Sequence, residues 1–145
     1  MTAKRMEKLN PLKERRDLFT VEGDKDAPLA LVSWGSVAGA AREALELVRG
    51  KGLPVKLLVP KLMFPIAENV YREFFASVHA GLVVEQSYQG QLRQVLRMYV
   101  DVPAGIESFA KTSANPILAI EVAQRLEAIA ARCGIKPAVT AARTA

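Results

Sequence analysis

The chain has 145 residues, of which 50% are hydrophobic and 24% are charged, and its formal net charge is +5. This length is typical of one domain with a substantial core, and the composition is that of a folded protein rather than a disordered chain. No apolar run approaches the roughly 20 residues of a membrane-spanning helix, and the start lacks the apolar centre of a secretion signal. We therefore expect a cytoplasmic protein without a membrane partner.

The positive charge is concentrated near the N-terminus. Residues 1–19 hold six Lys or Arg against three acids, which leaves only two of the five net positive charges for the rest of the chain. Nucleic-acid binding is therefore not expected, although binding through residues 4–16 stays open as an alternative. Since apolar side chains such as Met6 and Leu12 lie among the charges, we interpret residues 1–27 as a basic amphipathic arm that docks on a neighbouring surface.

Four apolar runs bounded by Gly, Pro or polar residues predict buried strands. The first of them, "LALVSWGS", ends in Gly35 and follows residues 20–28, which we interpret as a polar loop. The fourth run is short and lies in a less regular stretch. The strands are predicted within residues 29–36, 53–62, 81–86 and 106–109.

Helical segments with one apolar face alternate with these strands. Ser36 is the expected N-cap of the first helix, and Pro65 suits the first turn of the second. In the last helix, Asn115 is the expected cap and Pro116 the first-turn residue. The helices are predicted within residues 37–52, 63–78, 89–99 and 117–134.

The alternation of apolar strands with helices predicts a three-layer α/β/α fold. Its sheet should be mostly parallel and covered by helices on both faces. We assign the α/β domain to residues 28–134 and expect a flexible tail at residues 135–145, because that segment has no pattern that would pair or pack.

In open α/β sheets, functional groups gather where the strands end at their carboxyl edge. The turn at Gly35 and Ser36 follows the first strand, and free N–H groups at the start of the next helix could hold an anion there. However, the spacing from Gly35 to Gly39 does not match a dinucleotide-binding loop, and the chain has no Gly-Lys-Ser/Thr phosphate loop. A stand-alone module that binds a small ligand or an anion at Gly35 and Ser36 stays open as an alternative.

The segment "EQSYQGQ" after the third strand is the densest polar cluster of the sequence. One carboxylate without a partner acid or histidine is a poor acid–base pair, whereas amides and a tyrosine suit a binding surface. We therefore predict a contact surface for another subunit or a ligand and assign no catalytic residue. The predicted contact residues are Glu85, Gln86, Tyr88, Gln89 and Gln91.

His79 and Cys133 are the only histidine and the only cysteine in the chain. A disulfide within the chain is therefore impossible, and an iron–sulfur cluster or a structural zinc site held by this chain alone is excluded, because these need about four such ligands. Neither residue lies in a nucleophile motif. We predict an ordinary packed or surface role for both, with no cofactor-binding and no metal-binding residue in this chain.

Three segments of the sequence together resemble a known family. "VSWGS", "LLVPKLMFPI" and "VVEQSYQGQLRQVLR" are similar, in this order and spacing, to the C-terminal domain of the α subunit of 2-oxoacid:ferredoxin oxidoreductases, most closely the 2-oxoglutarate type. The likeness runs from about Lys4 to Leu126, and its most specific part is Glu85 with Gly90, Gln91 and Leu92. Ser87 departs from the family, which commonly has Asn there.

The resemblance implies the fold of the transketolase C-terminal domain and a role in a complex that oxidatively decarboxylates a 2-oxoacid to an acyl-CoA. Thiamine diphosphate, magnesium, iron–sulfur clusters and coenzyme A belong to the complete complex, and none is assigned to residues here. We expect a detached or separately encoded C-terminal domain that is inactive alone and assembles with the other subunits. Whether the chain also forms a homo-oligomer, and which 2-oxoacid is used, stay open.

Overall fold

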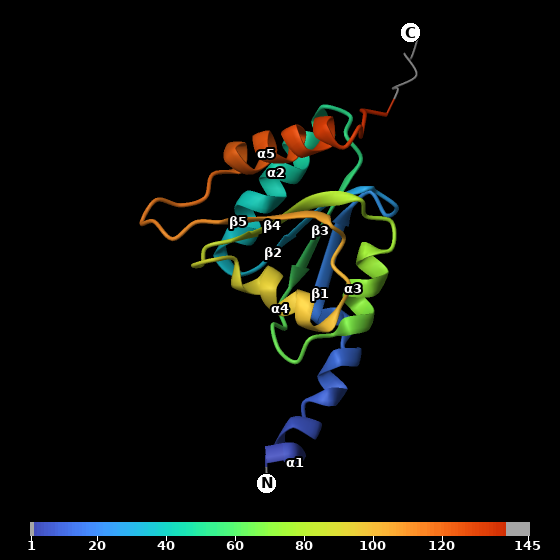
Figure 1. The fold of residues 1–145 in the computed structure, drawn as a ribbon, viewed down its shortest axis with the longest axis vertical. Helices are drawn as coiled ribbons and strands as arrows, with labels where there is room; N and C mark the ends of the chain where they lie inside the picture. Colours follow the sequence, from blue (N-terminus) through green and yellow to red (C-terminus); the bar gives the residue numbers. More distant parts are fainter. Residues whose placement is uncertain (1, 139–145) are drawn as a thin grey trace.

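A computed structural model describes residues 2–138 and shows a five-stranded sheet between two layers of helices (Figure 1). The strand order is β1-β3-β2-β4-β5. The predicted three-layer α/β architecture is therefore confirmed. The strands are β1 (Phe19–Gly23), β2 (Leu29–Ser33), β3 (Val55–Pro60), β4 (Ala80–Glu85) and β5 (Gly105–Ala110).

The sheet is parallel except at one edge. β2 pairs in parallel with β3 and β4, and β4 pairs in parallel with β5, whereas β1 runs antiparallel to β3. Every residue of β2, β3 and β4 is buried, as expected for strands that have helices on both faces. The apolar runs of the sequence identified these three strands for that reason.

Helices cover the two faces of the sheet in pairs. α2 (Ala38–Gly50) and α5 (Ala119–Arg132) pack on one face, where Leu45 and Leu126 meet alternate residues of the central strands. α3 (Glu68–Phe75) and α4 (Gln91–Tyr99) pack on the other face around Tyr71 and Leu96. Figure 1 shows these pairs above and below the strands. Each face thus has its own apolar cluster, as the predicted helical periodicity requires.

The arm enters the sheet instead of ending in a loop. It contains α1 (Thr2–Glu7) and the 3₁₀ turns η1 (Asn10–Glu14) and η2 (Arg16–Leu18), and it then continues directly into β1. The prediction of a polar loop from residue 20 is therefore wrong for the residues of β1. The segment was missed because Val21 is exposed and Phe19 is only half-buried, and because its pairing partner β3 lies far along the chain.

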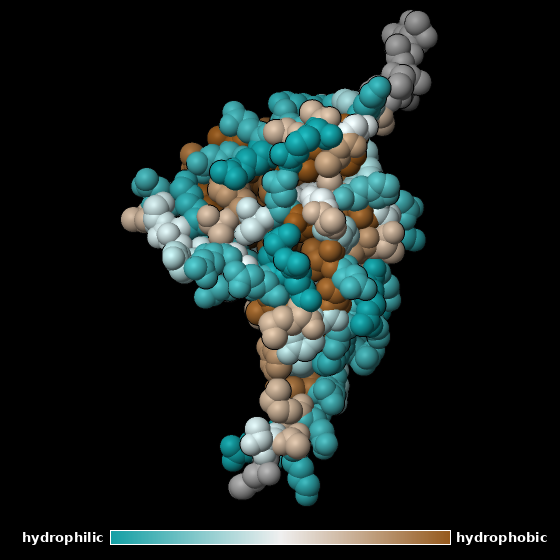
Figure 2. Space-filling view, viewed as in Figure 1, coloured by the Kyte–Doolittle hydropathy of each residue, from teal (hydrophilic) through white to brown (hydrophobic). Residues whose placement is uncertain are grey.

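Two ion pairs fix the base of the arm. Lys13 Nζ lies 3.0 Å from a carboxylate oxygen of Glu68, and the Arg16 guanidinium donates to both oxygens of Glu73 at 2.6 Å. Beyond these contacts α1 has no buried residue and extends away from the body (Figure 1). In Figure 2, tan and brown residues follow one side of this segment and hydrophilic residues follow the other, which agrees with the amphipathic pattern.

All four predicted helices begin one to five residues too early, and α4 begins at Gln91 rather than at residue 89. α2 begins after a 3₁₀ turn, η3 (Gly35–Val37), without a side-chain cap from Ser36. α3 begins at Glu68, so Pro65 lies in the preceding loop. α5 begins at Ala119 rather than beside Asn115.

The packed part of the chain extends beyond residue 134. Ile135 packs against the apolar cluster under α2 and α5, and the Ala138 N–H donates to the Gly52 carbonyl at 2.8 Å. The rest of the predicted tail, residues 139–145, lies outside the described residues. Within residues 2–138, no helix combines the length and the apolar character that crossing a membrane requires.

Gly81 allows the central strands to approach one another. Its φ is +154°, and a Cβ added there would lie 1.9 Å from the carbonyl oxygen of Ala30 on β2. We expect Gly81→Ala to lower the free energy of unfolding by about 3 kcal/mol, because both the backbone and the neighbouring strand must shift. Urea unfolding measures the change.

Gly39→Ala is the matched control for this substitution. Gly39 lies in α2 and has no atom within 4 Å of the added methyl group, so alanine should stabilise the helix by about 0.5–1 kcal/mol. Equal effects of the two substitutions would contradict the close contact between β2 and β4.

Candidate functional site

The four parallel strands end at the same edge of the sheet, and an exposed apolar side chain follows each of them. We call these four residues the carboxyl rim: Trp34 after β2, Phe64 after β3, Tyr88 after β4 and Leu118 after β5. Tyr88 is the most exposed of them, at 67%. Aromatic side chains on a surface are enriched where proteins bind one another.

Glu85 lies beneath this rim and not on it. It is the last residue of β4 and only 1% exposed. Its carboxylate accepts hydrogen bonds from the Leu92 N–H at 3.1 and 2.9 Å, and another from the Ser87 hydroxyl. Leu92 lies in the first turn of α4, where backbone N–H groups have no partner within the helix. Glu85 therefore caps α4 from the strand that precedes it.

The turn between β4 and α4 depends on two residues with positive φ. Gln89 and Gly90 have φ values of +64° and +67°. A Cβ on Gly90 would also lie 2.2 Å from Oγ of Ser108 on β5. Glycine at position 90 therefore allows both the left-handed backbone conformation and the close approach of the neighbouring strand. This is a structural reason for the glycine of the "GQL" motif.

The predicted contact residues divide into two groups. Gln86, Tyr88, Gln89 and Gln91 are exposed beside one another, whereas Glu85 is enclosed and bound within the chain. Of the exposed group, Gln86 donates from Nε2 to the Ser113 carbonyl at 3.2 Å. A contact role for the four exposed residues stays a prediction, and the carboxylate of Glu85 is not available on this surface.

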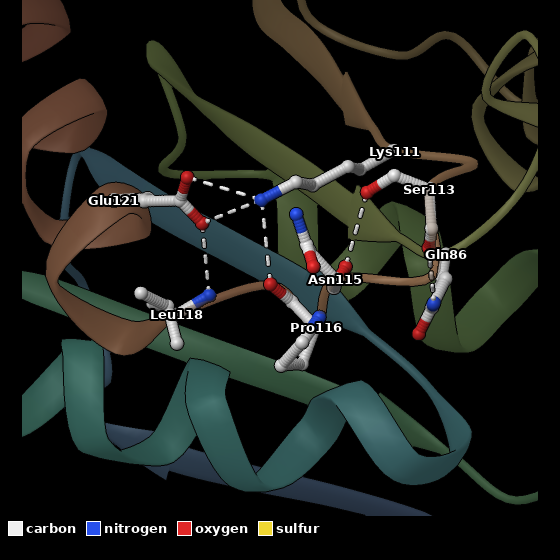
Figure 3. A network of polar contacts seen from close by, with 7 residues as sticks. All are labelled: Gln86, Lys111, Ser113, Asn115, Pro116, Leu118 and Glu121. Atoms are coloured by element: carbon white, nitrogen blue, oxygen red, sulfur yellow. Dashed lines mark hydrogen bonds and ion pairs between the residues drawn. The ribbon is translucent and has the colours of Figure 1, made fainter.

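A second polar network holds the loop between β5 and α5 (Figure 3). The Lys111 ammonium lies 3.1 Å from the Glu121 carboxylate and 3.3 Å from the Pro116 carbonyl. Glu121 also accepts from the Leu118 N–H at 3.0 Å, and this bond together with Lys111 lowers the pKa of its carboxyl group. Glu121 thus caps α5 and positions Leu118 of the carboxyl rim.

Glu121 is the sequence signal for this network, and a search for a capping residue before the helix overlooks it. The predicted cap, Asn115, is exposed, and the Ser113 hydroxyl donates to its carbonyl. The cap is instead made from within the helix: Glu121 lies three residues after Leu118, and its side chain accepts a hydrogen bond from the Leu118 N–H. A glutamate in the first turn of a helix therefore indicated where α5 begins.

The other residues singled out from the sequence lie outside the segment that follows β4. Gly35 and Ser36 are exposed in the turn η3, and anion binding there stays a prediction. His79 and Cys133 are also exposed. The His79 backbone N–H joins the loop before β2 by donating to the Pro28 carbonyl at 2.8 Å.

Comparison with known proteins gives a consistent set of similarities. A family model described as pyruvate:ferredoxin oxidoreductase core domain II matches residues 27–127. The α subunit of 2-oxoacid:ferredoxin oxidoreductase 2 from Aeropyrum pernix is 30% identical over 132 residues, which cover 89% of this chain and 20% of the relative. The corresponding α subunit from Saccharolobus solfataricus is 28% identical over 112 residues, covering 75% and 17%. The chain thus spans about a fifth of the length of these relatives.

Solved structures share the fold. The 2-oxoglutarate:ferredoxin oxidoreductase from Magnetococcus marinus, solved with 2-oxoglutarate, coenzyme A and succinyl-CoA bound, matches with a TM-score of 0.81 and 28% identity, covering 89% of this chain and 22% of that one. A transketolase from Pichia stipitis matches with a TM-score of 0.57 and 17% identity, covering 91% and 21%. The second likeness concerns the fold alone, and it confirms the predicted transketolase-like architecture.

Glu85→Ala tests the capping role of the buried carboxylate. It leaves the Leu92 N–H without its acceptor and opens a void beneath the rim, so we expect a loss of about 2–4 kcal/mol in the free energy of unfolding. Gln91→Ala, an exposed neighbour, should change that free energy by less than about 0.5 kcal/mol. Urea unfolding of both variants measures this, and a loss for Glu85→Ala as small as that of the control would contradict the cap.

The cap on α5 should depend on pH. Because the pKa of Glu121 is lowered in the folded chain, its stabilising contribution is present above the ordinary glutamate pKa of about 4.3 and is lost as pH falls through the lowered value. Hydrogen exchange of the Leu118 amide, corrected for its intrinsic pH dependence, should lose protection in that range. Glu121→Gln should largely remove this pH dependence, and an unchanged profile in the variant would assign the effect to another group.

Proposed function

Because the chain belongs to the family of pyruvate:ferredoxin oxidoreductase core domain II, we propose that it is a non-catalytic module of a 2-oxoacid:ferredoxin oxidoreductase and contributes to assembly of that complex. The complex would oxidatively decarboxylate a 2-oxoacid to an acyl-CoA. The similarity to the enzyme from Magnetococcus marinus, solved with 2-oxoglutarate and succinyl-CoA, supports 2-oxoglutarate as the substrate of that complex.

One observation carries the assembly role: the carboxyl rim is exposed and mainly aromatic, while the acid beneath it is bound within the chain. Glu85 accepts hydrogen bonds from the Leu92 N–H and the Ser87 hydroxyl within the chain, so it supports the surface from below. Above it, Trp34 and Tyr88 present rings to the outside. Such side chains supply much of the binding energy when a partner covers them.

The arm belongs to the same proposed surface. β1 begins beside the carboxyl end of β3, since Phe19 pairs with Pro60, so the arm leaves the body at the edge that carries the rim. Its side chains include Met6, which is 45% exposed, and Leu9, which is half-buried. A subunit that covered the rim could therefore also bury the apolar side of the arm.

The cofactors of the complex would be held by other parts of it. An iron–sulfur cluster needs several thiolates, and Cys133 is the only cysteine in the sequence. The donor set of this chain therefore does not fit such a cluster. We propose that thiamine diphosphate, magnesium, the iron–sulfur clusters and coenzyme A are bound by the companion polypeptides, which would supply the parts of the relatives that this chain does not span.

Association with the companion subunits is the direct test. Tagged full-length chain should retain the remaining subunits of the oxidoreductase from the same organism when they are co-expressed, and the complex should then reduce ferredoxin with 2-oxoglutarate and coenzyme A. The chain by itself should show no turnover. Failure to associate with any companion subunit, or turnover by the isolated chain, would contradict the proposal.

The rim should dominate this association. We expect Trp34→Ala and Tyr88→Ala each to weaken binding of the companion subunits about 30-fold, the loss that corresponds to a residue of about 2 kcal/mol at an interface. Leu47→Ala is the control, since Leu47 is about as exposed as Trp34 but lies on α2. Biolayer interferometry with immobilised chain measures the affinities. An equal effect at all three positions would place the interface elsewhere on the domain.

A further inference from the structure

A pocket lies between β1 and the helix α3, and it extends from the base of the arm at Arg16 toward the amino end of β3. Its volume is about 260 Å³. The floor is Lys56, the second residue of β3, and the apolar wall is formed by Val21, Val70, Phe74 and Ala76. Neither the similarity to known proteins nor the proposed assembly role uses this pocket.

Lys56 is unusual among the lysines of the chain because it is buried. Its exposed fraction is 3%. The ammonium donates to the Ser77 hydroxyl at 2.8 Å and to the Lys25 carbonyl at 3.2 Å, and it lies 4.8 Å from the centre of the Phe74 ring. The Ser77 hydroxyl in turn donates to the Ala27 carbonyl at 3.1 Å, which fixes it as an acceptor toward Lys56.

These contacts give the ammonium hydrogen-bond acceptors but no negatively charged partner. No carboxylate of residues 2–138 forms an ion pair with Lys56; its partners are a hydroxyl, a carbonyl and a ring. Burial lowers the pKa of Lys56, and the more distant charge of Asp26 only opposes that effect. Buried charges in proteins are normally paired, so an ammonium held this way is unusual.

The other charges around the pocket leave room for one anion. Arg16 is bound to both carboxylate oxygens of Glu73, so this pair is internally neutral. The remaining charged side chains that line the pocket are Lys25, Lys56 and Asp26. Two ammonium groups therefore face one carboxylate, and one negative charge from outside would complete the balance.

We propose that this pocket binds a small organic monocarboxylate, with the carboxylate on the Lys56 ammonium and a short apolar chain against Val70 and Phe74. The negative charge supplies the counter-ion that Lys56 lacks. The volume is below the roughly 300–1,000 Å³ of pockets for drug-sized ligands and suits an acid of a few carbon atoms.

Butyrate is a suitable probe, and butyramide is its neutral counterpart. In full-length chain, butyrate should shift the amide resonance of Ser77 in a saturable manner, and butyramide should bind at least tenfold more weakly. Acetate lacks two methylene groups of butyrate. Its binding should be weaker by about fourfold for each missing methylene group, because that group no longer contacts the apolar wall. Butyrate should also raise the pKa of Lys56, followed through its ε-methylene resonances, because it binds the charged form.

Lys56→Met and Lys61→Met separate a specific site from general attraction to a basic protein. Both remove one positive charge next to or within β3, but Lys61 is exposed beyond the other end of the strand. Lys56→Met should weaken butyrate binding at least tenfold, and Lys61→Met should leave it unchanged. Equal binding of butyrate and butyramide, or undiminished binding to Lys56→Met, would overturn the proposal. An unchanged Lys56 pKa in the wild-type chain would overturn it even if the Met variant failed to fold.

Discussion

The carboxylate of Glu85 holds the end of β4 to the start of α4, and the surface above it depends on that bond. A charged group with an exposed fraction of 1% persists only where donors surround it, and here the Leu92 N–H and the Ser87 hydroxyl provide them. Ser87, where the family commonly has Asn, is therefore sufficient to donate a hydrogen bond to Glu85. Within the polar cluster after β4, Glu85 and Ser87 therefore stabilise the turn. The exposed side chains of the cluster form the proposed contact surface.

The two edges of the sheet have different chemistry. At the carboxyl edge, caps made by Glu85 and Glu121 fix loops that carry exposed apolar side chains, which suits the large surface of another protein. At the amino edge, a single buried ammonium lies in a small pocket, which suits a small charged molecule.

Sequence reasoning recovered what depends on burial and missed what depends on pairing over long distances. The central strands and all four large helices were predictable because their apolar runs and periodicities are local. β1 was not, since Val21 is exposed and only its partner β3 makes the segment a strand. The exposed part of the contact cluster was also predictable from composition. The burial of Glu85 and of Lys56 was not, because both are polar residues and their burial depends on contacts with other elements, Glu85 with the start of α4 and Lys56 with Phe74 and Ser77.

The ion pairs at the base of the arm make its orientation sensitive to ionic strength. Arg16 with Glu73 and Lys13 with Glu68 are at least partly exposed, and counter-ions at about 0.15 M screen such charges over about 8 Å. The hydrogen bonds between β1 and β3 do not weaken in the same way. Concentrated salt would therefore loosen the base of the arm while leaving the sheet intact, so α1 would take a less fixed direction from the body in high salt than in dilute buffer.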